Sequence, residues 1–170
     1  MKKMRKTKFT LIEVTVAFGV LAILIMFLMQ FLNTAQTSWN FAEKRARAYA
    51  DSRTAFDFIE KALNSSERGS AVTVGNSLVF SGVKPYDNRE YKTITVSLND
   101  GVLKLDNDEL ISNVVSFYSQ KINTNSYVIR LVMFGSEADY AEYNAEPNEN
   151  KKKEYLSQHG FSFIRLVNLQ

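Results

Sequence analysis

The sequence predicts an α+β protein, in which a long N-terminal helix packs its second half on an antiparallel β-sheet. Two observations support this fold class. From Phe9 to Asn64 the sequence is typical of one long helix: an apolar run is followed by apolar residues at helical spacing. No Gly or Pro occurs between residues 33 and 64. After Gly69 the period changes to alternation, and short apolar runs are separated by turn residues, which is typical of strands joined in hairpins.

A basic leader, residues 1–8, opens the chain and carries five of its 21 Lys and Arg residues. The remaining 16 stand against 18 Asp and Glu, so the chain after the leader has a balance of −2. Because no basic stripe remains there, we expect no nucleic-acid contact. The chain has no Cys and one His, His159, which argues against disulfides, a His-based metal site and a Ser-His catalytic pair. We therefore expect no cofactor, and a protein that is not an enzyme.

Residues 9–32 form the predicted membrane-spanning half of the helix. They would make a helix of about 36 Å, enough to cross a hydrocarbon core of about 30 Å. The leader charges are expected to stay cytoplasmic, which places the C-terminus outside. A cleaved secretory signal is the competing interpretation, but its apolar region is usually only about 7–15 residues long. One carboxylate, Glu13, lies inside the apolar run, and such a costly position predicts a functional role.

Residues 33–66 are predicted to continue this helix in amphipathic form. Their apolar side chains recur at spacings of three, four or seven, which gives one stripe that needs a partner surface. A sheet with one apolar face is the natural partner. The stop signal is Asn64 with the two serines that follow. The stripe consists of Trp39, Ala42, Ala46, Tyr49, Phe56, Ile59 and Leu63.

Residues 67–170 are predicted to form one extracytoplasmic domain of about six or seven strands. The strongest hairpin signal is Asn99-Asp100-Gly101, and Gly75-Asn76-Ser77 is a second one. Ser81–Tyr91 is predicted as a loop, Leu110–Ile122 as one strand, and Gly135–Gly160 as a long polar loop, with the possibility of a short helical piece. The other predicted strands are 71–74, 78–80, 93–98, 102–105, 127–134 and 161–169.

The run F-T-L-I-E-V at residues 9–14, behind a basic leader and opening a long apolar helix, resembles the N-terminus of type IV pilins and pseudopilins. The resemblance implies that a prepilin peptidase cuts between Lys8 and Phe9, and that the new amine of Phe9 is methylated. It also implies that Glu13 meets the terminal amine of a neighbouring subunit during assembly. The family has Gly before the cut, where this chain has Lys8.

Beyond the first helix, the order of elements is similar to J-type minor pseudopilins of type II secretion, to W-type minor pilins and to minor subunits of competence pili. The resemblance implies a structural subunit of the inner membrane that enters a pilus or pseudopilus. Its partners would be other pilin subunits, the prepilin peptidase, the inner-membrane assembly platform and membrane lipid. The alternative is an uncleaved, single-pass anchored extracytoplasmic domain that binds or senses a partner.

Two further groups allow alternative interpretations. The acids of the predicted long loop could bind calcium, although a solvated surface is the simpler expectation. These acids are Glu137, Asp139, Glu142, Glu146 and Glu149. Arg165, inside the last strand, is expected to face water on an edge strand, with a partner contact or a buried ion pair as the other possibilities.

Overall fold

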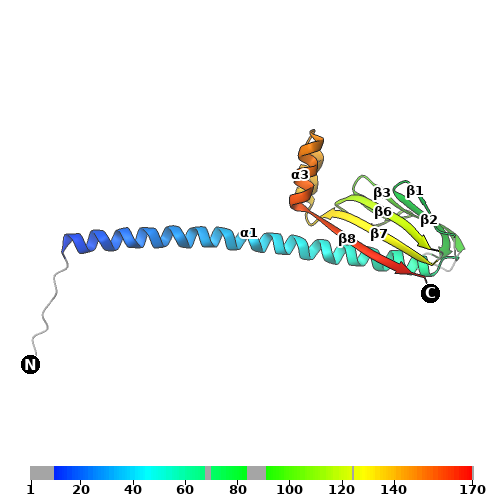
Figure 1. Cartoon of the computed structure of the whole chain (residues 1–170), viewed down its shortest axis with the longest axis horizontal. Helices are drawn as coiled ribbons and strands as arrows, with labels where there is room; N and C mark the ends of the chain where they lie inside the picture. The colour runs from blue at the N-terminus through cyan, green and yellow to red at the C-terminus, as the bar shows by residue number, and fades with distance from the viewer. Residues whose placement is uncertain (1–9, 68–69, 84–90, 124, 170) are drawn as a thin grey trace, which may run out of the picture. The chain divides into compact units, whose positions relative to one another are not determined.

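The computed structural model describes residues 10–67, 70–83, 91–123 and 125–169 (Figure 1). Its first element, α1 (Leu11–Asn64), is a single helix of 54 residues. This confirms the predicted long helix and its end at Asn64. The contacts within the chain separate two units, Met1–Ala42 and Glu43–Gln170, and the boundary falls inside α1.

In the second unit, one face of α1 is buried at regular helical spacing. Phe56, Ile59 and Leu63 of the predicted stripe are buried, but its earlier positions differ, because Ala46 is exposed and Tyr49 is 58% exposed. The small residues Ala48 and Ser52 are buried instead, which allows the strands to approach the helix closely. Trp39 and Ala42, the first members of the predicted stripe, belong to the first unit. The buried residues are Ala48, Ser52, Ala55, Phe56, Ile59, Ala62 and Leu63.

The strands of the second unit form two antiparallel sheets within the described residues, rather than the single sheet that the sequence predicts. The first has the order β1 (Val72–Val74), β2 (Ser77–Val83), β3 (Tyr91–Asn99), β4 (Val102–Leu105) and β5 (Asp108–Ile111). The second has the order β6 (Val114–Asn123), β7 (Ser126–Phe134) and β8 (Gly160–Asn168).

The division into two sheets arises where one strand was expected over Leu110–Ile122. Asn113 has a left-handed backbone with φ of 62°, which ends β5 and starts β6 in a new direction. Strand β2 reaches Val83 and strand β3 begins at Tyr91, so the expected loop over Ser81–Tyr91 is wrong for its first three residues and its last one. Residues 84–90 of that loop lie outside the described part of the chain.

The hairpin between β3 and β4 confirms the strongest turn prediction. Asn99 pairs with Val102, and the two residues between them, Asp100 and Gly101, have φ of 48° and 78°. Positive φ at both central positions is the type I′ geometry, whose twist matches that of the strands. Gly75, with φ of 58°, likewise turns β1 into β2.

The core lies between the sheets and the buried stripe of α1. Alternation along the strands builds it: β2 and β7 bury every second residue over most of their length, as expected for sheets with one covered face. Tyr127 is fully buried, and its hydroxyl donates a hydrogen bond of 3.3 Å to the carbonyl of Ala71. The largest fully buried side chains include Tyr127, Phe80, Phe117, Phe134, Ile59 and Leu63.

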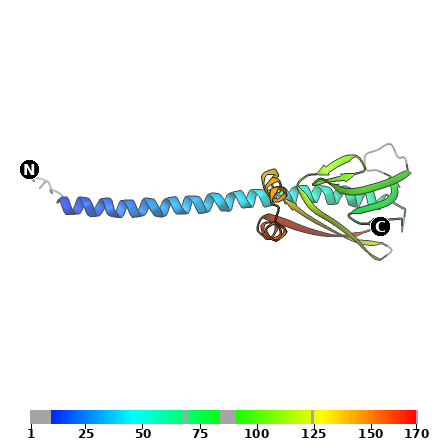
Figure 2. The ribbon, with the colours of Figure 1, turned by 90° about the horizontal axis from the view of Figure 1, so that it is seen from above.

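Two helices, α2 (Glu137–Ala145) and α3 (Glu149–His159), replace most of the predicted polar loop between β7 and β8. Ser136 and Asn148 cap their first turns with side-chain oxygens, which sequence reasoning overlooked. The ring of Phe134 packs against Tyr143 at 5.4 Å and Tyr155 at 5.9 Å between centroids. Figures 1 and 2 show this helical pair at the end of the sheet where β7 ends and β8 begins.

Candidate functional site

Glu13, the predicted assembly residue, lies in the first turn of α1 and bonds to Thr10. The backbone N–H of Thr10 donates to Glu13 Oε2 at 2.8 Å, and the Thr10 hydroxyl donates to the same oxygen at 3.0 Å. The N–H of Glu13 donates to Thr10 Oγ1 at 3.3 Å. This reciprocal pairing is a capping box, which satisfies N–H groups that a helix otherwise leaves without partners. The spacing T-x-x-E is its sequence signal.

The surface around Glu13 is apolar on every side of the helix. The large hydrophobic side chains from Leu11 to Leu32 are 40–83% exposed. In the sequence, Glu13 is the only charged residue between Phe9 and Ala42. A helix that is apolar all round needs lipid or other apolar helices for burial, and this one is long and apolar enough to span a membrane. Lys8 and Phe9, the predicted cleavage and methylation residues, lie outside the described residues.

A second polar cluster joins α1, α2 and α3 within the second unit. Lys44 on α1 forms a salt bridge of 2.9 Å with Asp139 on α2. Asp139 is only 7% exposed. The Ser136 hydroxyl donates to the other oxygen of Asp139 at 2.7 Å. Burial alone would raise the pKa of Asp139, but the hydrogen bonds from Lys44 and Ser136 and the positive charge of Lys44 outweigh it. The pKa of this carboxyl therefore lies below its ordinary value, and Asp139 is ionised at neutral pH.

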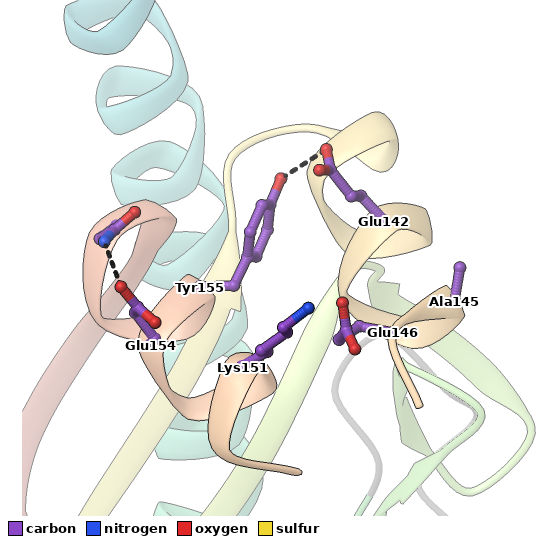
Figure 3. A pocket seen from close by; sticks show the side chains of 7 residues that line it. Glu142, Ala145, Glu146, Lys151, Glu154 and Tyr155 are labelled. Carbon is purple, nitrogen blue, oxygen red and sulfur yellow. Dashed lines mark hydrogen bonds between the residues drawn. The ribbon is translucent and has the colours of Figure 1, made fainter. Parts of the chain in front are cut away.

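A pocket of about 430 Å³ lies between α2 and α3 (Figure 3). In Figure 3, Tyr155 points from α3 to Glu142 on α2, and its hydroxyl donates a hydrogen bond of 3.0 Å to that carboxylate. Burial, followed by this hydrogen bond, raises the pKa of Tyr155, so the phenol stays protonated and remains a donor. Glu154 accepts from the Gln158 amide at 3.4 Å, and Glu146 accepts from the N–H of Asn148. Of these bonds, the one between Tyr155 and Glu142 joins α2 to α3.

The acids that could have formed a calcium site are placed on or beside these helices. Asp139 binds Lys44, and Glu142 binds Tyr155. In the part of the chain that the structure describes, no three His, Cys, Asp or Glu side chains are grouped to hold a metal ion. The predicted polar loop is therefore a folded helical hairpin, in which Asp139 and Glu142 bind neighbouring side chains.

Arg165 does not simply face water, which was the main prediction. It forms ion pairs, which were one of the alternatives, and its side chain is 35% exposed. Its Nη1 lies 2.7 Å from Oδ1 of Asp57, and its Nη2 lies 2.6 Å from Oε2 of Glu60. Both carboxylates come from α1, where their separation of three residues places them on one face. The guanidinium therefore ties β8 to α1, a pairing that the strand pattern alone could not reveal.

The comparisons with known proteins identify no relative. No protein-family model matches this chain, and no curated protein or solved structure is significantly similar to it.

Proposed function

We propose that this chain is a structural subunit of the pilin or pseudopilin kind, which assembles into a filament through the first part of α1. One observation carries the proposal: the first part of this helix exposes apolar side chains all round, whereas the second part belongs to a folded β-rich unit. Filament subunits need this division, because a shared apolar core holds them together while a separate domain stays in water.

Glu13 is the residue that would set the position of one subunit along its neighbour. A carboxylate in apolar surroundings is stabilised by a cationic partner, and the terminal amine of an adjacent subunit is one when the leader has been removed. This function requires a cut between Lys8 and Phe9. Methylation of the new Phe9 amine would keep its positive charge.

The subunit is inserted in the inner membrane, with the leader inside and the β-rich unit outside. Its partners are other subunits of the filament, the prepilin peptidase and the inner-membrane assembly platform. The J-type pseudopilins and W-type minor pilins are the groups whose order of elements it most resembles. This is a structural role rather than an enzymatic one.

The capping box favours a second candidate, an uncleaved anchored domain that binds or senses a partner. Thr10 satisfies Glu13 within the chain, and Lys8 replaces the expected Gly. In this alternative the carboxylate needs no neighbouring subunit, and α1 serves only as a membrane anchor.

The intact mass of the membrane-extracted chain distinguishes the two functions. A chain that starts at Phe9, with or without one methyl group, supports the filament subunit. A chain that keeps its leader supports the anchored domain. As a second readout, Glu13→Ala should leave the protein in the membrane and reduce its recovery in sheared filaments; unchanged recovery contradicts the assembly role.

A further inference from the structure

Strand β8 is an edge strand of the second sheet. It pairs with β7 on one side only and is the last strand of its sheet among the described residues. Its nine residues pair with β7 in an unbroken register, from Gly160 opposite Phe134 to Asn168 opposite Ser126. An edge strand of this kind presents a row of N–H and C=O groups to any extended chain beside it.

Strand β8 carries few of the usual protections of a sheet edge. The strand contains no Pro and no Lys, and its pairing shows no bulge. Its one charged residue, Arg165, is bound to Asp57 and Glu60. Ile164 and Leu166 are 68% and 54% exposed beside the open backbone. A long, regular and apolar edge is expected to pair with another chain unless it is covered.

A groove of about 350 Å³ lies between this edge and α1, inside the second unit. Four consecutive β8 residues, Ser162 to Arg165, line it. Successive side chains of a strand point to opposite faces of the sheet. Because side chains from both faces of β8 line the groove, the groove runs beside the edge of the strand. On the opposite wall, Tyr49 packs edge to face on Phe163, with 6.3 Å between their centroids.

One positive charge in the groove, that of Arg53, is available to an acidic occupant. The two charged residues that line it are Arg53 and Arg165. Arg165 is neutralised by α1, but Arg53 is exposed and has no carboxylate within salt-bridge distance in the described part of the chain. An approaching segment with a carboxylate near Arg53 would gain a charged pair beside an apolar, partly desolvated wall.

We propose that the groove between α1 and β8 binds an extended, acidic segment of a partner protein, which adds a strand to β8 and places a carboxylate on Arg53. Backbone hydrogen bonds supply the pairing, and alternate side chains of the added strand face α1. The site does not depend on the filament function, because the groove lies entirely within Glu43–Gln170.

The test uses the full chain in lipid nanodiscs and a fluorescent, end-blocked peptide of sequence T-V-E-V-D-V-T. The first control is a peptide with Lys at both acidic positions. The second control is a pair of peptides in which every second backbone nitrogen is methylated, at the odd positions in one peptide and at the even positions in the other. Affinity is measured by fluorescence anisotropy, and amide exchange locates the peptide on residues 160–168. We expect the acidic peptide to bind at least about 10-fold more tightly than the Lys peptide. It should also bind at least about 10-fold more tightly than one of the two methylated peptides, the one whose methyl groups block the hydrogen bonds to β8.

Charge and edge are tested separately with matched variants. Arg53→Glu should weaken binding of the acidic peptide about 10-fold or more and improve binding of the Lys peptide, while Arg45→Glu, an exposed α1 position outside the groove, should change it less than about 2-fold. Ile164→Lys should also weaken binding, and Ile122→Lys, equally apolar and exposed on β6, should not.

Three outcomes overturn the proposal. The first is no binding of the acidic peptide up to about 1 mM, the weak limit of useful recognition. The second is equal binding of both methylated peptides, which would exclude strand addition. The third is dimerisation of the chain that Ile164→Lys abolishes, because the groove would then receive a second copy instead of an acidic partner.

Discussion

Lys44 on α1 and Asp139 on α2 form a salt bridge of 2.9 Å across a separation of 95 residues. The carboxylate is almost completely buried, and Ser136 donates to its second oxygen. This contact connects the helical pair α2 and α3 to the helix that carries the whole second unit. Because the contact is a salt bridge, changing the pH or replacing either charged residue tests how much it stabilises the unit.

Stability should depend on the ionisation of Asp139. Its pKa is lower in the folded chain than in the unfolded one, so the unfolded chain binds more protons at acidic pH. The stabilisation is therefore fully present above the unfolded value, about 3.9, and is lost as the pH falls through the lower folded pKa. We expect Asp139→Asn to lower the unfolding free energy by about 1–3 kcal/mol near pH 6, and this difference to begin to shrink as the pH falls below about 4. Thermal unfolding in nanodiscs, followed by near-UV circular dichroism, measures this difference.

Removing the cation should be as costly as removing the acid. Lys44→Ala leaves a buried carboxylate without its counter-ion, at a cost of about 2 kcal/mol or more. Arg47→Ala is the matched control, because the Arg47–Glu43 pair lies one turn away on the same helix and is exposed to water. We expect it to cost less than about 1 kcal/mol. Equal effects of the two substitutions in chemical denaturation would contradict the special role of Asp139.

Thr10 and Glu13 allow the capping and assembly roles to be separated. Glu13→Gln keeps a side-chain acceptor for the capping box but removes the charge, and Thr10→Ala removes the capping hydroxyl while it keeps the charge. If the charge binds a neighbouring subunit, Glu13→Gln should lower filament recovery by about 10-fold or more, and Thr10→Ala should have a small effect. Immunoblots of sheared filaments and membranes measure the ratio. The opposite order would assign Glu13 to the helix end alone.

Gly135 should not tolerate a side chain, because the helix backbone lies against it. A Cβ at this position would overlap the carbonyl group of Lys44. Backbone cannot rotate away as a side chain can, so we expect Gly135→Ala to destabilise the unit by about 1–3 kcal/mol or to cause misfolding. Gly75→Ala is the control: it has φ of 58° but nothing within 4 Å, and should cost only about 1 kcal/mol. Urea unfolding of both variants tests the difference.

The Arg165 fork should be specific for arginine. Its two terminal nitrogens bind Asp57 and Glu60 separately, which an ammonium group cannot reproduce with the same geometry. Because all three side chains are partly exposed, we expect Arg165→Lys to cost about 1 kcal/mol, and Arg165→Met no more than about 2. The melting temperature should fall from the unmodified chain to Arg165→Lys and further to Arg165→Met. Equal melting temperatures of the unmodified chain and Arg165→Lys would contradict a role that is specific for arginine.

Local pattern was sufficient to predict much of the fold. The period of 3.6 residues and the absence of Pro predicted α1 to its end at Asn64, and the pair Asp100-Gly101 predicted the hairpin between β3 and β4. These features depend on neighbours in the sequence, so a single chain contains the information. Between β7 and β8 the sequence predicted a loop with at most a short helical piece. The two helices found there are mostly polar, and their stability depends on caps and on packing against Phe134.

The sequence by itself determined that a membrane-length apolar helix carries one acid, Glu13, and that a strand-rich region follows. Only the tertiary structure decided that Asp139 meets Lys44, that Arg165 meets α1, and that an open groove lies beside β8. The physical reason is distance along the chain. Periodicity reports which face of an element is apolar, but which charged groups meet depends on how the sheets and helices pack.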